Sequence, residues 1–347
     1  MFIYYQNLRK EIDVRQKWLE TVLTGEKKWI LENQGPEGEF YMNGSKAGDV
    51  NPYFACMAAL GLLAETKNCP ITETEKKAVG RYLDWHTGIL LETDGKMGIY
   101  RKKSGKLIYK EKADSEDGYL GMYLFLMVKY LEKTESTDLP EYWKKGISLA
   151  LKKIQSLMQD GITQVSEENT TVYLMDNLEV WKGLYELEHA GLKDVQAIRE
   201  MRNKLQAQIE KLFWDDANQR WRIIENSDLY HQKEFYPDGV AQIYPLIYEF
   251  PVKEKKKQKI LYKQFTERFQ WQKLTKKRNG FLWAMTGMAA AQMGDINNLL
   301  EMIRNYEAEY CENRKYPLYT GEAGWICMEC EKLYSLYERK IKTGFLV

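Results

Sequence analysis

The chain alternates two kinds of helical segment that differ in the arrangement of their hydrophobic positions. In the first kind, hydrophobic residues surround the helix, which predicts burial on every side. These inner segments span residues 52–64, 119–131, 172–187, 240–250, 281–293 and 325–337. The second kind carries one hydrophobic stripe on a charged body, for example Trp143, Ile147 and Ile154. These outer segments span residues 8–32, 73–91, 141–159, 194–213, 253–271 and 297–310.

An outer segment followed by an inner segment, six times over, predicts an all-α fold, an (α/α)6 toroid of six helical hairpins. A closed ring gives every inner helix a neighbour on both sides. An open superhelix of helix pairs is the alternative, but such repeats keep a constant period. The inner helices are predicted to start at uneven spacing, near residues 52, 118, 174, 239, 281 and 323. We interpret residues 1–347 as one barrel domain.

Two connections are predicted to form strands rather than helices. Residues 97–101 and 107–110 have the pattern of a β-hairpin with its turn at Ser104 and Gly105, and residues 220–224 have the pattern of another short strand. Long connections in a compact domain are often where function is placed.

Charge and composition narrow the function classes. The chain has 51 Lys and Arg against 50 Asp and Glu, a net charge of +1, and so lacks the basic footprint of a nucleic-acid or membrane-surface protein. It contains neither a stretch long enough to span a membrane nor a signal peptide at its start. We expect a soluble monomer, cytoplasmic as given, or secreted if a signal peptide was removed.

The cysteines do not predict a disulfide framework or a metal site. Their number, five, is odd and their spacing irregular. Cys327 and Cys330 have the spacing of half a zinc site, but they fall in a hydrophobic helical run and the chain has only three His. We expect buried thiols, no metal and no cofactor.

The predicted chemistry lies where the inner helices begin. All six hairpins run in the same direction, so the six junctions that lead into inner helices lie together at one end of the ring. All six carry an aromatic residue and five carry an acid. The candidates, in chain order, are Asp49, Tyr53, Asp114, Glu116, Asp117, Tyr119, Asp176, Tyr236, Asp238, Trp283, Glu322 and Trp325.

Helix capping explains a single acid at a helix start, with a contribution of about 1 kcal/mol. It does not explain an aromatic residue beside the acids, or the crowded cluster of Asp114, Glu116 and Asp117. Cleavage of a glycosidic bond needs one protonated and one ionised carboxyl group, and Tyr and Trp combine apolar ring faces with polar edges. The pattern therefore indicates a glycosidase.

We predict an inverting glycoside hydrolase for a neutral poly- or oligosaccharide. Asp238 is the predicted base, and Asp49 or the cluster at residues 114–117 is the predicted acid. The predicted sugar platforms are Tyr53, Tyr119, Tyr236, Trp283 and Trp325, and the further substrate-binding residues are Glu116, Asp176 and Glu322.

The segments Asp114-Ser-Glu116-Asp117-Gly-Tyr119 and Tyr236-Pro-Asp238-Gly, each opening an inner helix, resemble the six-hairpin glycosidase superfamily, nearest to glycoside hydrolase family 8 and its relatives. The resemblance covers the whole chain as architecture but is specific only in these segments. It implies that residues 114–117 grip the sugar at the cleavage point and that Asp238 activates water. The family's general acid, a Glu at the first inner helix, has no counterpart here, which leaves Asp49, Glu39 or another junction to supply it.

Several other functions fit a helical toroid. A sugar epimerase would place histidines on inner helices, but His86, His189 and His231 lie away from the inner-helix starts. A polysaccharide lyase would need groups that neutralise a uronate, which disagrees with an acid-rich rim. Terpene cyclases and prenyltransferases are also helical toroids, but the chain shows neither a clustered Asp-Asp motif flanked by an apolar wall nor zinc ligands. An inactive glycan-binding protein and a purely structural scaffold remain as alternatives.

Overall fold

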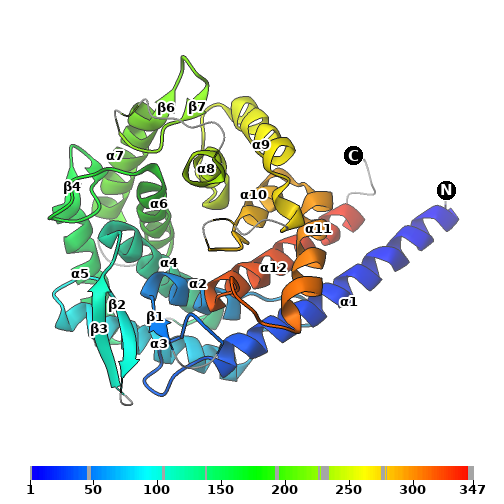
Figure 1. Cartoon of the computed structure of the whole chain (residues 1–347), viewed down its shortest axis with the longest axis horizontal. Helices are drawn as coiled ribbons and strands as arrows, with labels where there is room; N and C mark the ends of the chain where they lie inside the picture. The colour runs from blue at the N-terminus through cyan, green and yellow to red at the C-terminus, as the bar shows by residue number, and fades with distance from the viewer. Residues whose placement is uncertain are drawn as a thin grey trace.

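The fold is a ring of helix pairs. The computed structural model describes residues 2–44, 48–103, 106–136, 139–191, 195–225, 227, 234–274, 278 and 280–342. Viewed down its shortest axis, the chain runs once around the ring, with one set of helices inside and the other outside (Figure 1). The predicted all-α (α/α)6 toroid is confirmed.

Inner and outer helices alternate along the chain as the hydrophobic pattern predicts. The inner helices are α2 (Pro52–Leu62), α4 (Glu116–Thr134), α6 (Leu174–His189), α8 (Val240–Ile247), α10 (Thr286–Met293) and α12 (Thr320–Lys342). The outer helices are α1 (Phe2–Glu32), α3 (Glu73–Glu92), α5 (Glu141–Leu157), α7 (Val195–Phe213), α9 (Lys255–Phe269) and α11 (Ile296–Tyr306). Each inner helix contacts the next one, and α12 packs against α2 to close the ring. Helix α6 therefore stands three places from α12 in either direction, on the opposite side of the axis.

Glycines allow two of the inner helices to approach closely. A Cβ atom at Gly61 of α2 would lie 2.4 Å from the Cα atom of Gly324 of α12, and one at Gly324 would lie 2.1 Å from the carbonyl oxygen of Met57. Both distances are too short for a methyl group, so an alanine at either position requires the backbones to move apart. The closure of the ring thus depends on small residues at this crossing.

We expect Gly324→Ala to destabilise the protein by about 1–3 kcal/mol, the usual cost of overpacking a well-packed core. The measurement is the melting temperature by circular dichroism. Gly25→Ala is the matched control, because no atom lies within 4 Å of the added methyl group and alanine is preferred over glycine in a helix by about 0.5–1 kcal/mol. An unchanged melting temperature for Gly324→Ala would contradict the close crossing.

The start of the fifth inner helix differs from the prediction. The hydrophobic pattern places it near residue 281, but α10 begins at Thr286. Trp283 has a φ of 60°, in the left-handed region, and the N–H groups of Trp283 and Ala284 donate to the carboxylate of Glu322 on α12. Residues 281–285 therefore form a loop that is held by a side chain from another helix. The fourth inner helix begins with a π-helical turn, η1 (Phe235–Gly239).

Small antiparallel sheets decorate the ring. Strand β1 (Asp49–Val50) pairs with β2 (Gly98–Lys103), which pairs with β3 (Lys106–Lys112), so the predicted hairpin is present and gains a third strand. Its turn residues Ser104 and Gly105 lie outside the described residues. The predicted strand at residues 220–224 is shorter: β7 (Arg220–Trp221) pairs with β6 (Trp214–Asp215), and Ile224 forms a bridge with Tyr173. The pair β4 (Met158–Gln159) and β5 (Ile162–Thr163) was not predicted.

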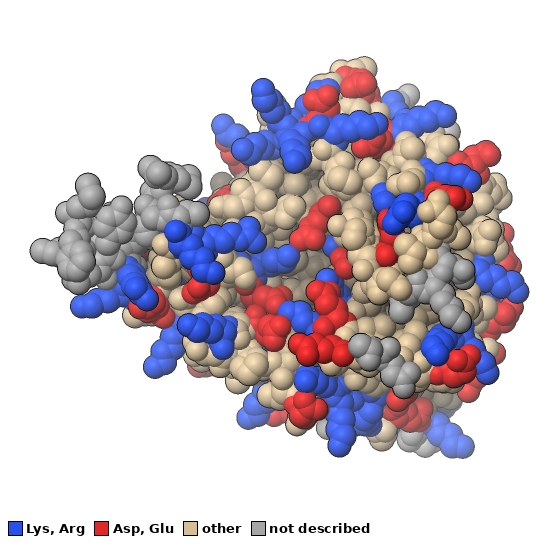
Figure 2. Space-filling view, turned by 180° about the vertical axis from the view of Figure 1, so that it is seen from behind, with Lys and Arg blue, Asp and Glu red and all other residues tan. Residues whose placement is uncertain are grey.

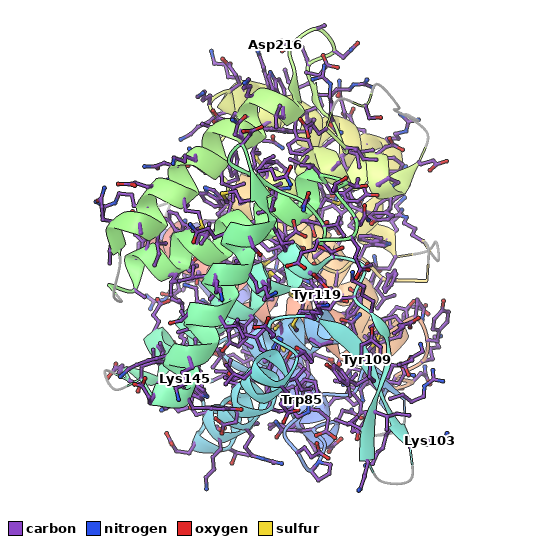
Figure 3. All side chains as sticks on the ribbon, turned by 90° about the vertical axis from the view of Figure 1, so that its left-hand side faces the viewer. Trp85, Lys103, Tyr109, Tyr119, Lys145 and Asp216 are labelled. Atoms are coloured by element: carbon purple, nitrogen blue, oxygen red, sulfur yellow. The ribbon has the colours of Figure 1, made fainter. Side chains whose placement is uncertain are left out.

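The two ends of the ring differ. Figure 3 shows Lys103 and Tyr109 of the β2–β3 hairpin along one edge, while Lys145 of outer helix α5 lies on the opposite side. The hairpin leads directly into the start of α4, so it marks the end at which the inner helices begin.

The prediction that Cys327 and Cys330 are buried thiols is confirmed. All five cysteines are free; Cys56 is also buried, while Cys69 and Cys311 are partly exposed. Among the described residues, no group of His, Cys, Asp and Glu is arranged to hold a metal ion. In the same part of the chain, no helix combines the length and hydrophobicity needed to cross a bilayer.

Candidate active site

Two adjoining chambers lie at the end of the ring where the inner helices begin. The first, the axial chamber, has a volume of about 210 Å³ and lies between the starts of the inner helices. It is lined by Asn51, Tyr53, Phe54, Asp114, Ser115, Tyr119, Met175, Asp176, Glu179, Tyr236, Tyr244, Phe281, Trp283, Met285, Glu322 and Trp325. Residues from α2, α4, α6, α8 and α12 thus meet at one point on the ring axis.

The second, the side chamber, has a volume of about 450 Å³ and lies over the connections that lead into α4, α6 and α8. It is lined by Asp114, Ser115, Asn169, Tyr173, Met175, Asp176, Ile223, Ile224, Ser227, Glu234, Tyr236, Pro237 and Asp238. The two chambers share Asp114, Ser115, Met175, Asp176 and Tyr236. These five residues form the boundary between the chambers.

Aromatic rings wall the axial chamber. Phe54 and Phe281 are stacked, with ring centroids 5.4 Å apart and an angle of 8° between their planes. The Tyr236 and Trp283 rings lie 4.6 Å apart, and the Trp283 indole N–H donates to the carbonyl of Arg278 at 2.8 Å. The indole is therefore fixed in place by neighbours on both sides.

Glu179, one turn into α6, is surrounded by phenols. Its Oε1 accepts hydrogen bonds from the hydroxyl groups of Tyr53 and Tyr244, each at 2.6 Å, and from Tyr248 at 3.2 Å. Burial raises the pKa of Glu179 to about 7, although the three phenol hydrogen bonds act in the opposite direction by stabilising the anion. The tyrosines come from α2 and from the α8 segment, so Glu179 ties three inner helices together.

Glu322 stands at the start of α12, across the ring from α6. Its Oε1 accepts the backbone N–H of Trp283 at 3.2 Å, and its Oε2 accepts that of Ala284 at 2.8 Å. Burial raises the pKa of Glu322 to about 7, against the effect of these amide donors. The two amides fix the carboxyl group in one orientation at the wall of the axial chamber.

Asp176, at the start of α6, lies on the boundary between the chambers. Burial raises the pKa of Asp176 well above its usual value, and the nearby carboxyl groups of Asp117 and Glu179 raise it further. A group with such a pKa keeps its proton where an ordinary aspartate has lost it. Asp114 and Asp176 both line the two chambers, and Asp176, with its raised pKa, is therefore a carboxylic acid that faces both.

The acidic cluster at the start of α4 divides among different environments. Asp114 is exposed, lines both chambers and lies beside the phenol of Tyr119. Asp117 is buried behind the chamber wall, where it accepts hydrogen bonds from Ser115 at 2.8 Å and Thr163 at 2.7 Å; burial raises the pKa of Asp117 to about 6. Glu116 is also buried, 3.8 Å from Lys112. Neither Asp117 nor Glu116 lines a chamber.

Besides Asp117, two predicted catalytic residues lie outside the axial chamber. Asp49 lies on β1, where Arg101 Nε approaches its carboxylate to 2.6 Å and Lys110 Nζ to 2.8 Å. These ion pairs lower the pKa of Asp49, so it does not have the raised pKa of a proton donor at neutral pH. Asp238 is buried in η1 and lines the side chamber only. The structure therefore places neither residue beside Glu179 and Glu322.

The remaining candidates do converge. Tyr53, Tyr119, Tyr236, Trp283, Trp325, Asp176 and Glu322 all line the axial chamber, from junctions far apart in the chain. Their roles stay predictions. Among the described residues that line the two chambers, none is Lys, Arg or His. The chambers thus present carboxyl, hydroxyl, amide and aromatic groups without a positive side chain.

Solved structures share this ring. A structure described as a wild-type glycosidase matches 93% of the chain and 98% of its own, with 13% identity and a TM-score of 0.66. An inactive α-1,6-mannanase variant from Salegentibacter, in complex with α-1,6-mannotetrose, matches 92% of the chain and 99% of its own, with 9% identity and a TM-score of 0.64. A GH76 α-mannanase from Bacteroides thetaiotaomicron matches 94% and 97%, with 12% identity and a TM-score of 0.54. No protein-family model and no curated protein matches the sequence.

At these identities the likeness concerns the fold. It supports the predicted resemblance to the six-hairpin glycosidases at the level of architecture, while the resemblance to family 8 stays a prediction.

Sequence reasoning did not single out Glu179, or its partners Tyr244 and Tyr248. A signal was present, because Glu179 follows Asp176 by three residues and so lies on the same face of the helix. An acid on an otherwise hydrophobic inner helix, in register with one at its start, indicates a polar site inside the ring.

A further carboxyl group is buried two turns below Glu322 on α12. Glu329 is fully buried, and neither of its oxygens has a hydrogen-bond partner among the described residues. It packs against Gly287 of α10, and burial together with the nearby Glu322 raises the pKa of Glu329 well above its usual value. Glu329 therefore stays protonated inside the core over a wide range of pH.

We expect Glu329→Gln to flatten the fall in stability at higher pH. Between the unfolded and folded pKa values of Glu329 the folded state binds the extra proton, so stability falls as pH rises, by up to about 1.4 kcal/mol per pH unit. Glutamine does not titrate, so the variant lacks this fall. In urea unfolding, the free energy of unfolding of the variant should therefore rise relative to that of the native chain from pH 5 to pH 8. The exposed Glu141→Gln is the control. Parallel stability curves for Glu329→Gln and the native chain would contradict the expectation.

Proposed function

We propose that the chain is a glycoside hydrolase that cleaves a neutral glycan by inversion. The observation that supports this proposal most strongly is the axial chamber, in which three carboxyl groups with raised pKa values (Asp176, Glu179 and Glu322) face aromatic walls. Hydrolysis of a glycosidic bond requires a protonated acid and an ionised base in one site. Aromatic faces supply apolar contact to a sugar ring, and carboxyl and amide groups bind its hydroxyl groups.

Asp176 is the proposed proton donor. Its raised pKa keeps the proton available at neutral pH, and its position at the boundary lets it reach an oxygen that links a sugar in one chamber to a sugar in the other. Asp176 gives its proton to this glycosidic oxygen as the bond to the anomeric carbon breaks.

Glu322 is the proposed base. It stands on α12, across the ring from α6, so it approaches a bound sugar from the side opposite Asp176. Inversion needs this arrangement, because the base activates water on the face away from the leaving group. The two backbone amides hold Glu322 in one orientation. Since burial raises the pKa of Glu322 to about 7, we expect activity to fall as the pH drops below about 7.

The similar glycosidase supports functional roles for Glu322 and Glu179, and leaves the role of Asp176 to the geometry of the two chambers. Solved variants of that protein replace, in order along its chain, a tyrosine, a glutamate, a phenylalanine and a second glutamate. The axial chamber contains the same residue types in the same order, as Tyr53, Glu179, Phe281 and Glu322. One of those variants was solved in complex with glucose, and the Salegentibacter mannanase binds a mannose oligosaccharide. Both are neutral sugars.

The test is a hydrolysis assay on aryl glycosides and oligosaccharides of neutral hexoses, including glucose and α-1,6-linked mannose series. The native chain is compared with the double variant Asp176→Asn, Glu322→Gln. Release of reducing ends by the native chain alone would support the proposal. If no glycoside is cleaved, but an oligosaccharide raises the melting temperature of the native chain, the protein is a glycan-binding protein on a glycosidase fold.

A further inference from the structure

We propose that the enzyme removes one sugar at a time from a chain end, with the terminal sugar in the axial chamber and the next sugar in the side chamber. This inference rests on the proposed function and adds the mode of attack. Three observations carry it: Trp325 separates the axial chamber from the cavity at the other end of the ring, the axial chamber is the smaller of the two chambers, and it meets the larger one at the proposed proton donor.

The axial chamber is closed at its inner end. Trp325 lines both this chamber and a separate cavity at the opposite end of the ring, so its indole lies between the two. The Tyr248 ring packs beside it at 6.3 Å, and its hydroxyl donates to Glu179. Trp325, with Tyr248 packed against it on the side of the other cavity, forms the floor of the axial chamber.

Ion pairs gather at the far end of the ring, where the inner helices end. Lys182 contacts Glu186 at 2.8 Å and Glu249 at 3.0 Å, and Glu249 also contacts Lys332 at 2.9 Å. Figure 2 shows the face seen from behind, with acidic and basic side chains gathered around its middle. Lys182 and Glu186 are buried, whereas Glu249 and Lys332 are partly exposed. These charged side chains line the separate cavity at this end of the ring, on the far side of Trp325.

The axial chamber is the smaller of the two chambers. At about 210 Å³, it has room for a sugar ring and is less than half the size of the side chamber, at about 450 Å³. An internal segment of a glycan needs space on both sides of the bound sugar. The axial chamber offers such space on one side only, through the boundary residues Asp114, Asp176 and Tyr236.

The side chamber suits the remainder of the substrate. Its volume of about 450 Å³ is about twice that of the axial chamber, and its rim includes the exposed residues Asp114, Asn169 and Glu234. Carboxylate and amide groups accept hydrogen bonds from sugar hydroxyls. Because no described lining residue is basic, an acidic sugar is disfavoured and a neutral one is accepted.

The experiment follows product lengths with time. The native chain is incubated with a substrate oligosaccharide of five sugars labelled at the reducing end, and the products are separated by chromatography. Because the leaving sugar lies in the side chamber and Glu322 lines only the axial chamber, the non-reducing end enters the axial chamber, and we expect unlabelled monosaccharide and a labelled tetramer as the first products. Early dimers and trimers would overturn the proposal, whereas no cleavage of any glycoside would overturn the proposed function itself.

A variant tests the role of the side chamber. We expect Glu234→Ala to lower kcat/KM for a disaccharide at least 5-fold more than for the corresponding aryl glycoside, whose leaving group lacks sugar hydroxyls. The exposed Glu141→Ala, on outer helix α5, is the matched control. An equal loss on both substrates, or no loss on either, would contradict the assignment of the leaving sugar to the side chamber.

Discussion

Replacing Asp176 by asparagine lowers kcat/KM for an oligosaccharide by about 10²–10⁴-fold, the range that general acid catalysis contributes, but lowers it much less for an aryl glycoside with a good leaving group. The amide cannot give a proton to the glycosidic oxygen, and a nitrophenolate leaves without one. The measurement is kcat/KM for the two substrates side by side, with the native chain as reference.

The matched control for Asp176→Asn is Asp216→Asn. Asp216 is an exposed aspartate at the tip of the β6–β7 hairpin (Figure 3), and it lines neither chamber. Its replacement leaves both rates unchanged. If Asp176→Asn slows both substrates equally while the melting temperature is kept, Asp176 is not the proton donor.

Glu322→Gln removes activity on both kinds of substrate, by about 10²–10⁴-fold. A glutamine cannot take a proton from water, and activation of the leaving group does not replace that step. For the native chain, kcat/KM should increase as the pH rises toward about 7, because the buried Glu322 loses its proton over this range. The residual kcat/KM of the variant should not show this increase. The measurement is kcat/KM from pH 5 to pH 9 for both substrates.

Stability must be followed in parallel for this variant. The glutamine NH₂ group faces the backbone N–H of Trp283 or Ala284, so one hydrogen bond is lost at a cost of about 1 kcal/mol. Glu329→Gln is the control, because it changes a buried glutamate on the same face of α12 outside both chambers. If kcat/KM of Glu322→Gln increases with pH below about pH 7 as it does in the native chain, Glu322 is not the base.

The fold could be predicted because the spacing of hydrophobic residues along the chain shows which faces of each helix are buried. The inner segments near residues 52 and 174 are hydrophobic all round, and helices begin at Pro52 and Leu174. The prediction was wrong where a tertiary contact decides the backbone: Glu322 holds the N–H groups of residues 283 and 284 in a loop, and helix α10 starts only at Thr286.

The sequence predicted where the site lies better than it predicted what each residue in the site does. All six helical hairpins run in the same direction, so the inner helices all begin at one end of the ring. This brings Tyr53, Asp176 and Glu322 to one chamber. The chain position of Asp49 is equivalent to theirs, yet Arg101 and Lys110 of the neighbouring hairpin pair with its carboxylate. The sequence pattern does not predict these ion pairs, because they depend on the register between β1 and β2.

The sequence by itself determined the alternation of inner and outer helices, the ring and the end of the ring at which acids and aromatic residues gather. Hydrophobic periodicity is a local property, and it is sufficient for these features. Only the tertiary structure decided which carboxyl groups stay protonated and which enter ion pairs. The pKa of a carboxyl group depends on burial and on neighbours distant in the chain, as with Glu179 among Tyr53, Tyr244 and Tyr248. These neighbours meet only when the ring closes.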